Sequence, residues 1–285
     1  MIDVIAHRGA SAYAPENTLA SFSKAVELNA DWFELDVQLT KDGHVVVVHD
    51  GDLERVAGVK KNVAEMTLEE VRRVDVGSRF SEEFAGEHIP VFDEALALAM
   101  NRSGVYVEIK VAKHDKALNR RIGEIVSNHR SSRDALLQAL MDEIEASQTP
   151  PLDLTRKVIA QVHALHMEDQ VVFQSFSPVC TVVTLTEAPE IRTEFLSFIE
   201  KDDPERWPRS VVFANAVGVA GLNVNIETAT PERVAAFHEA GMTCAVWTVD
   251  DPAIVQCCVE RGVNRIISNK PDVVLATLRD LGKRQ

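Results

Sequence analysis

The chain has 285 residues, of which 46% are hydrophobic and 26% charged, a composition typical of a globular protein with one large core. Its formal net charge of −14 argues against nucleic acid or an anionic membrane surface as a partner, while a small phosphate-bearing ligand stays possible because a bound metal can reverse the field inside a cleft. Four cysteines without C-x-x-C spacing indicate neither a disulfide framework nor a zinc knuckle. The lack of an export signal or a long apolar run predicts a cytoplasmic protein without stable membrane insertion.

Short apolar runs alternate with longer segments of helical period, which is typical of βα units around a parallel sheet. The predicted strands are Ile2–Ala6, Trp32–Leu39, Val105–Ile109, Val171–Gln174, Ile191–Leu196, Gly221–Asn225, Cys244–Thr248 and Arg265–Ser268. Helices are predicted at Leu19–Leu28, Phe92–Met100, Pro231–Ala240 and Pro252–Arg261, where apolar residues recur at spacings of three and four. Eight strands in strict alternation with helices favour a closed (β/α)8 TIM barrel over an open sheet.

Two segments break the alternation. The turn residues Thr40 to Gly43 predict that the second strand folds back as a hairpin with Val45–Val48, and the polar stretch that follows predicts an inserted lobe at about 51–90. The second segment, Val111–Asp169, contains long helical stretches interrupted at Asn128–Asp134 and at Pro150-Pro151. With no repeat or flexible linker, we expect a single domain over residues 1–285.

The second predicted strand carries two carboxylates, Glu34 and Asp36. Because alternate residues of a strand share a face, both acids point one way while Phe33, Leu35 and Val37 point the other. Holding two like charges together is costly unless a divalent cation neutralises them, and such a cation prefers oxygen ligands. The alternative is a solvated polar face on an edge strand.

The third predicted strand ends in a similar way, with Glu108 and Lys110 on one face. Both lie at the carboxyl end of the strand, where barrel enzymes build their active sites. Glu108 would complete an oxygen-rich metal site with Glu34 and Asp36, and Lys110 would balance a phosphate. A buried structural Glu–Lys pair is the competing interpretation.

Two histidines also lie at strand ends. His7 ends the first strand, and His49 ends the returning arm of the hairpin, which places it opposite Glu34 and Asp36. Two imidazoles beside a bound phosphate are a chemically sensible acid/base pair near neutral pH. Arg8 is suited to a phosphate oxygen, and Glu16 is placed to orient it. The other histidines are interpreted as structural: His44, His88, His114, His129, His163, His166 and His238.

Seven blocks together resemble the glycerophosphodiester phosphodiesterases, in order and over nearly the whole chain. They are His7-Arg8-Gly9-Ala10-Ser11, Pro15-Glu16-Asn17-Thr18, Glu34 to Gly43, His49-Asp50, Glu108-Ile109-Lys110, Gln174-Ser175-Phe176 and Val246-Trp247-Thr248. The resemblance implies a barrel that hydrolyses glycerophosphodiesters to sn-glycerol 3-phosphate and an alcohol.

The resemblance also implies roles for particular residues. Glu34, Asp36 and Glu108 would bind Ca²⁺ or Mg²⁺, and His7 and His49 would be the general acid and base, in an order that the sequence leaves open. The remaining residues would contact or support the substrate: Arg8 and Lys110 on the phosphate, Glu16 behind them, Trp247 as an apolar wall beside the glycerol, and Gln174 and Phe176 as lining.

Two departures limit the resemblance. The last predicted strand is followed by Asn269-Lys270-Pro271, where the family usually shows an Asp-Arg pair before the proline, and Val111–Asp169 is longer than usual. Two alternative functions also stay open, namely a lysophospholipase D of the same family and a phosphodiester-binding protein without turnover. The preferred alcohol, the physiological metal, the nucleophile and the oligomeric state are not predicted.

Overall fold

The computed structural model describes residues 1–111 and 116–284, and within them eight parallel strands close into a barrel. The barrel closes because β1 pairs with both β11 and β2. The strands are β1 Asp3–Ala6, β2 Trp32–Leu39, β6 Gly104–Ile109, β7 Val171–Ser175, β8 Arg192–Ser197, β9 Gly221–Asn225, β10 Thr243–Trp247 and β11 Arg265–Ser268. All eight were predicted from the alternation, with ends that differ by at most one residue. The predicted TIM barrel is therefore confirmed.

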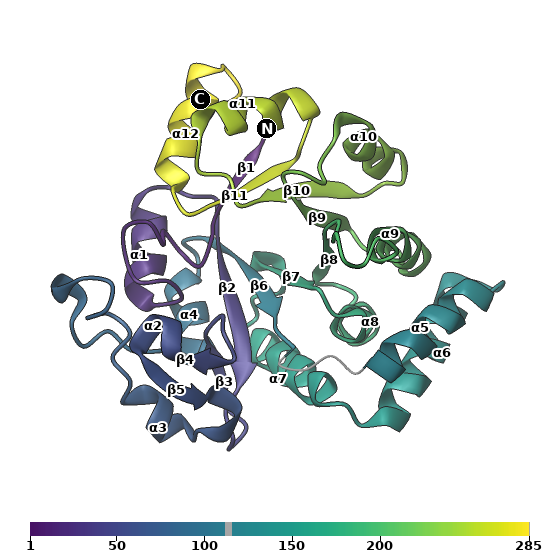
Figure 1. Ribbon diagram of the computed structural model, residues 1–285, viewed down its shortest axis with the longest axis horizontal. Helices are drawn as coiled ribbons and strands as arrows, with labels where there is room; N and C mark the ends of the chain where they lie inside the picture. Colours follow the sequence, from purple (N-terminus) through teal and green to yellow (C-terminus); the bar gives the residue numbers. More distant parts are fainter. Residues whose placement is uncertain (112–115, 285) are drawn as a thin grey trace.

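Helices surround the barrel on its outside (Figure 1). They are α1 Leu19–Glu27, α4 Phe92–Ala99, α5 Lys116–Asn128, α6 Arg133–Ser147, α7 Pro150–Ala164, α8 Pro178–Glu187, α9 Arg206–Val217, α10 Pro231–Glu239, α11 Pro252–Arg261 and α12 Pro271–Asp280, with a 3₁₀ turn, η3, at Glu168–Gln170. The side chains of Thr18, Thr230 and Asp251 cap the first turns of α1, α10 and α11, as their sequence positions indicate. None of the helices in these ranges is long and apolar enough to cross a bilayer.

The predicted hairpin is also present. Strand β3, Val45–Val47, pairs antiparallel with the end of β2. A small lobe follows, drawn at the lower left of Figure 1. Its elements are β4 Asp52–Leu53, α2 Glu54–Ala57, β5 Val59–Asn62, η1 Val63–Glu65, α3 Leu68–Arg72 and η2 Glu82–Phe84. The lobe buries an apolar cluster of its own against the hairpin: Val46, Val48, Leu53, Val63, Met66, Val71, Val76 and Ile89.

Two apolar layers hold the barrel together. The outer faces of the strands pack against the helices in the main core, to which Phe33, Leu35 and Val37 of β2 belong. Inside the barrel, a smaller cluster contains Ile5, Tyr106, Val172, Ala245 and Ile267, each buried at the middle of its strand. Because this cluster fills the interior below the strand ends, the carboxyl ends are left to carry polar side chains.

The long segment 111–169 forms α5, α6 and α7. Its predicted interruptions coincide with the end of α5 at Asn128, the start of α6 at Arg133 and the start of α7 at Pro150. Residues 112–115, which include the histidine predicted to be structural at position 114, lie outside the described residues. Helix α5 faces α9 across a groove that extends to Phe176, so this segment borders the carboxyl-end face of the barrel.

Candidate active site

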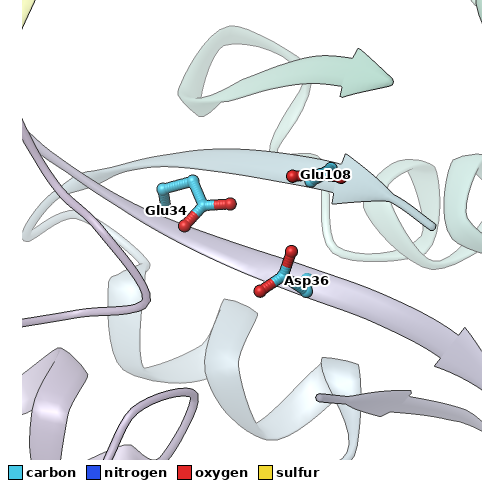
Figure 2. Close-up of side chains that lie close together, drawn as sticks. All are labelled: Glu34, Asp36 and Glu108. Carbon is cyan, nitrogen blue, oxygen red and sulfur yellow. The ribbon is translucent and has the colours of Figure 1, made fainter. Parts of the chain in front are cut away.

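Three carboxylates converge at the carboxyl ends of two neighbouring strands. Glu34 and Asp36 come from β2 and Glu108 from β6, and the register pairs Asp36 directly with Glu108. Figure 2 shows the three carboxyl groups gathered over these strands. One oxygen from each lies within 4.8 Å of the others, and all three residues are buried. The alternation expected along β2 therefore brings these acids together, with their apolar neighbours turned to the outer core.

Two cations partly neutralise this cluster. Lys110 Nζ lies 2.8 Å from Glu108 Oε1 and 3.5 Å from Asp36 Oδ1. Arg8 Nε lies 3.6 Å from Asp36 Oδ2, and the Arg8 backbone N–H donates to Glu34 Oε2 at 2.9 Å. Among the described residues the buried Oδ1 of Asp36 has no hydrogen-bond donor. Three carboxylates, one of which has a buried oxygen without a hydrogen-bond donor, are a ligand set that fits a hard divalent cation.

The pKa values of the three acids reflect this crowding. Burial, followed by the charges of Asp36 and Glu108, raises the pKa of Glu34 well above its usual value. Burial also raises the pKa of Glu108, to about 7, against the opposing effect of Lys110. Burial alone would raise the pKa of Asp36 too, but Lys110 and Arg8 outweigh it and hold that pKa low. Without a cation, the site therefore retains protons near neutral pH that a cation must displace.

Both predicted histidines lie at this cluster, and each uses Nδ1 for a structural hydrogen bond. His7 Nδ1 lies 2.7 Å from Asn269 Oδ1, and His49 Nδ1 lies 2.8 Å from Asp50 Oδ1. Burial, reinforced by the charge of Arg8, lowers the pKa of His7 to about 4, and burial also lowers the pKa of His49. Both imidazoles are therefore neutral near pH 7 in the absence of ligands, which leaves Nε2 of each ring available to the site.

The Arg8 side chain is held in place by a series of hydrogen bonds that reaches the lobe. Its guanidinium donates to Glu16 Oε1 at 2.9 Å, and Glu16 in turn accepts two hydrogen bonds from Arg55 of the lobe. Gly9 permits the tight turn after Arg8, since a Cβ there would lie 2.4 Å from Ser21 Oγ. Glu16 thus orients the Arg8 guanidinium. Glu16 itself borders the cleft between the barrel and the lobe and does not line the cavity beside the three carboxylates.

A cavity of about 160 Å³ collects most of the predicted residues. Its lining comprises His7, Arg8, Glu34, His49, Glu108, Lys110, Gln174, Phe176, Leu196, Trp247, Thr248 and Ile267. One wall is aromatic, because the rings of Phe176, Phe198 and Trp247 meet edge to face with centroids 5.9–6.1 Å apart. Asp36 lies beneath the cavity, fully buried, and Glu16 lies outside it. The cavity therefore combines a cluster of carboxylates, two cationic side chains, two imidazoles and an apolar wall.

The structure also identifies neighbours that the sequence did not single out for the site. Asn17 donates to Asp36 Oδ2 at 2.8 Å, although its position suggested only a helix start. Asn269 contacts His7, Asp50 contacts His49, and the Arg206 guanidinium stacks 4.3 Å from the centroid of Phe198. The block Pro15 to Thr18 and the departure at Asn269 were signals for two of them, but their partners could not be named without the fold.

Comparison with known proteins identifies the family of the chain. A model of the glycerophosphoryl diester phosphodiesterase family matches residues 7–273. The glycerophosphodiester phosphodiesterase of Caldanaerobacter subterraneus is 31% identical over 279 residues, which cover 98% of each chain. The glycerophosphodiester phosphodiesterase of Agrobacterium tumefaciens has a similar structure, with a TM-score of 0.71 and 25% identity over 97% of this chain and 100% of that one. A phosphodiesterase of Oleispira antarctica, in complex with its product sn-glycerol-3-phosphate, shares the fold, with a TM-score of 0.76 and 23% identity over 97% and 96% of the two chains. The chain therefore belongs to the glycerophosphoryl diester phosphodiesterase family and is an enzyme of that family.

Proposed function

We propose that this enzyme hydrolyses glycerophosphodiesters to sn-glycerol 3-phosphate and an alcohol, with a divalent cation and a pair of histidines. The observation that carries the proposal is the convergence of three buried carboxylates, two imidazoles and two cations at one cavity. The named activity of the Caldanaerobacter relative and the product bound to the Oleispira structure support the choice of substrate.

Glu34, Asp36 and Glu108 would hold Ca²⁺ or Mg²⁺, since carboxylate oxygens are the ligands that both ions prefer. When bound, such a cation supplies Lewis-acid polarisation of a phosphate oxygen. Arg8 and Lys110, already beside the acids, would bind the remaining phosphate charge, and Glu16 would keep the Arg8 guanidinium in place. Trp247 and Phe176 present an apolar wall that suits the carbon face of glycerol.

The two histidines would move the protons. One imidazole accepts a proton at Nε2 from the nucleophile, which is water or the neighbouring glycerol hydroxyl. The other donates a proton to the departing alkoxide. Burial favours neutral imidazole at His7, whereas His49 has a carboxylate partner, Asp50, that can stabilise an imidazolium. Both rings line the same cavity, so a phosphodiester bound there lies within reach of both.

The test is to replace each histidine separately. His7→Ala and His49→Ala should keep the affinity for Ca²⁺ or Mg²⁺, measured by calorimetry, yet lose at least about 100-fold in kcat on glycerophosphocholine. His129→Ala is the control, because His129 lies outside the active-site cavity and its ring bonds to a nearby backbone carbonyl, Ser132 O. Wild-type turnover in either active-site variant would remove that residue from the mechanism.

A substrate panel with and without chelator separates the alternatives. We expect hydrolysis of glycerophosphocholine and related glycerophosphodiesters that chelator abolishes and added cation restores. Faster turnover of lysophosphatidylcholine would indicate the lysophospholipase D activity instead. Binding of sn-glycerol 3-phosphate without hydrolysis of any diester, in the presence of either cation, would indicate a binding protein.

A further inference from the structure

Asn269 follows the last strand of the barrel, and its side-chain amide contacts the proposed catalytic His7. Asn269 Oδ1 lies 2.7 Å from His7 Nδ1, although the two residues are 262 positions apart. Asn269 follows β11, and His7 follows β1, and these two strands are paired in register. The contact is therefore set by barrel closure and not by a flexible surface loop.

The orientation of the Asn269 amide is determined by Asp250. Asn269 Nδ2 donates to Asp250 Oδ2 at 2.7 Å, and the Asn269 backbone N–H donates to Asp250 Oδ1 at 2.8 Å. Ser268 Oγ also donates to Asp250 Oδ1, at 2.8 Å. A carboxylate only accepts hydrogen bonds, so the NH₂ group must face Asp250. A flipped amide would set its oxygen against the carboxylate and lose that bond.

The direction of the next hydrogen bond follows from this orientation. With NH₂ on Asp250, the group facing His7 is the carbonyl oxygen Oδ1, which can only accept. Ser11 Oγ, a hydroxyl donor, lies 2.9 Å from the same oxygen. His7 Nδ1 must therefore carry a hydrogen, whether the ring is neutral or charged.

We propose that Asn269, oriented by Asp250, is a positioning residue that keeps the His7 hydrogen on Nδ1 and leaves Nε2 as the single nitrogen that exchanges a proton with the substrate. This inference rests on the proposed role of His7 in catalysis. Aspartate at position 269 would also offer His7 an oxygen acceptor. Asparagine, unlike aspartate, also donates to Asp250, whereas two carboxylates at this distance would repel each other.

The direct test is the tautomer of His7, read from imidazole ¹⁵N chemical shifts of ¹⁵N-histidine-labelled enzyme at pH 7 and assigned with His7→Ala. We expect the Nδ1–H form in the wild type. In Asn269→Leu, which removes the acceptor, we expect the Nε2–H form to be populated and kcat to fall about 10–100-fold with KM little changed. Asn269→Asp combined with Asp250→Asn exchanges the two groups, so it restores an acceptor for His7 without setting two carboxylates together, and it should recover the Nδ1–H form and most of the lost kcat.

Asn264→Leu is the matched control. Asn264 Oδ1 also lies beside a histidine ring nitrogen, His238 Nε2 at 2.9 Å, and accepts from the backbone N–H of Cys244 at 2.8 Å, but it lies away from the active-site cavity. This variant should leave both the His7 tautomer and kcat unchanged.

A wild-type His7 with its hydrogen on Nε2 would overturn the proposal, even if Asn269→Leu does not fold. So would an Asn269→Leu enzyme with the wild-type tautomer and wild-type kcat. If the wild type hydrolyses no glycerophosphodiester but shows Nδ1–H at His7, the proposed function fails while the positioning role of Asn269 stands.

Discussion

The side-chain amide of Asn17 forms hydrogen bonds that connect Asp36 to the residues just before α1. Asn17 is buried, donates from Nδ2 to Asp36 Oδ2 at 2.8 Å, and accepts from the Asp36 backbone N–H at 3.2 Å. We predict that Asn17→Gly weakens binding of Ca²⁺ or Mg²⁺ about 10–100-fold, because groups that orient a metal ligand typically contribute that much. Calorimetric titration at fixed pH measures the change. Glycine is the suitable replacement because Asn17 has a φ of 57°.

Asn29→Gly controls for the backbone effect of that change. Asn29 has a φ of 59° but is exposed and remote from the acids, so its replacement should leave cation affinity unaltered. Equal affinities in the Asn17 and Asn29 variants would show that Asn17 does not orient Asp36.

The sequence predicts the carboxylates better than it predicts the side chains that orient them. Glu34 and Asp36 could be assigned to one face because strand alternation is a local rule with a period of two. The contact of Asn17 with Asp36 spans 19 residues and that of Asn269 with His7 spans 262, and no periodicity connects such positions. Their partners become evident only when the barrel closes.

At the scale of elements, one arginine of the lobe connects it to two active-site groups. Arg55 of α2 donates to both oxygens of Glu16, at 2.6 and 2.8 Å, and to Asp50 Oδ2 at 2.6 Å. Glu16 holds Arg8, and Asp50 holds His49. Through the Arg55 guanidinium, the lobe therefore stabilises the positions of Arg8, which is proposed to bind phosphate, and of His49, which is proposed to transfer a proton.

We predict that Arg55→Ala lowers kcat about tenfold while the free energy of unfolding changes by less than about 1 kcal/mol. Arg55 is half-exposed, so its ion pairs contribute little stability, yet its loss frees Glu16 and Asp50 to move. Steady-state kinetics and thermal unfolding measure the two effects. Arg73→Ala removes a fully exposed pair with Glu69 on α3 and should change neither quantity. A loss of kcat that merely follows a loss of folded protein would contradict the bracing role.

The strands and four of the barrel helices, α1, α4, α10 and α11, were predicted by range, whereas the interior of the lobe was not. Runs of four to eight residues carry enough alternation to identify strands such as β2 and β6. The lobe is built from elements of two to five residues, which are too short to show a period. The residues of its buried cluster, such as Leu53, Val63, Met66 and Val71, are therefore scattered apolar residues in a polar stretch of the sequence.

For the whole molecule, the active-site ionisations make stability depend on pH. The pKa of Glu108 is raised from its usual 4.5 to about 7, and that of Glu34 is raised well above its usual value, so both carboxyls stabilise the metal-free fold when protonated. That contribution is present at low pH and is lost as pH rises through the folded values. The pKa of His7 is lowered from 6.5 to about 4, so His7 makes the fold more stable as pH rises. This contribution is complete above about pH 6.5. Among these groups, only the carboxyls change between pH 6.5 and 8, so they make the metal-free protein less stable as pH rises.

Cation binding should reverse that trend. A cation at 100 times its Kd stabilises the fold by about 2.7 kcal/mol, and each pH unit below about 7 removes about 1.4 kcal/mol of this, because a proton on Glu108 must first be displaced. We therefore predict that the rise in Tm caused by a fixed concentration of Ca²⁺ or Mg²⁺ is larger at pH 8 than at pH 6. Thermal unfolding with cation and with chelator at both pH values measures it. Glu108→Gln should weaken cation binding and flatten the pH dependence. A rise in Tm that is the same at pH 6 and pH 8 in the wild type would mean that the cation does not displace a proton from these carboxyls.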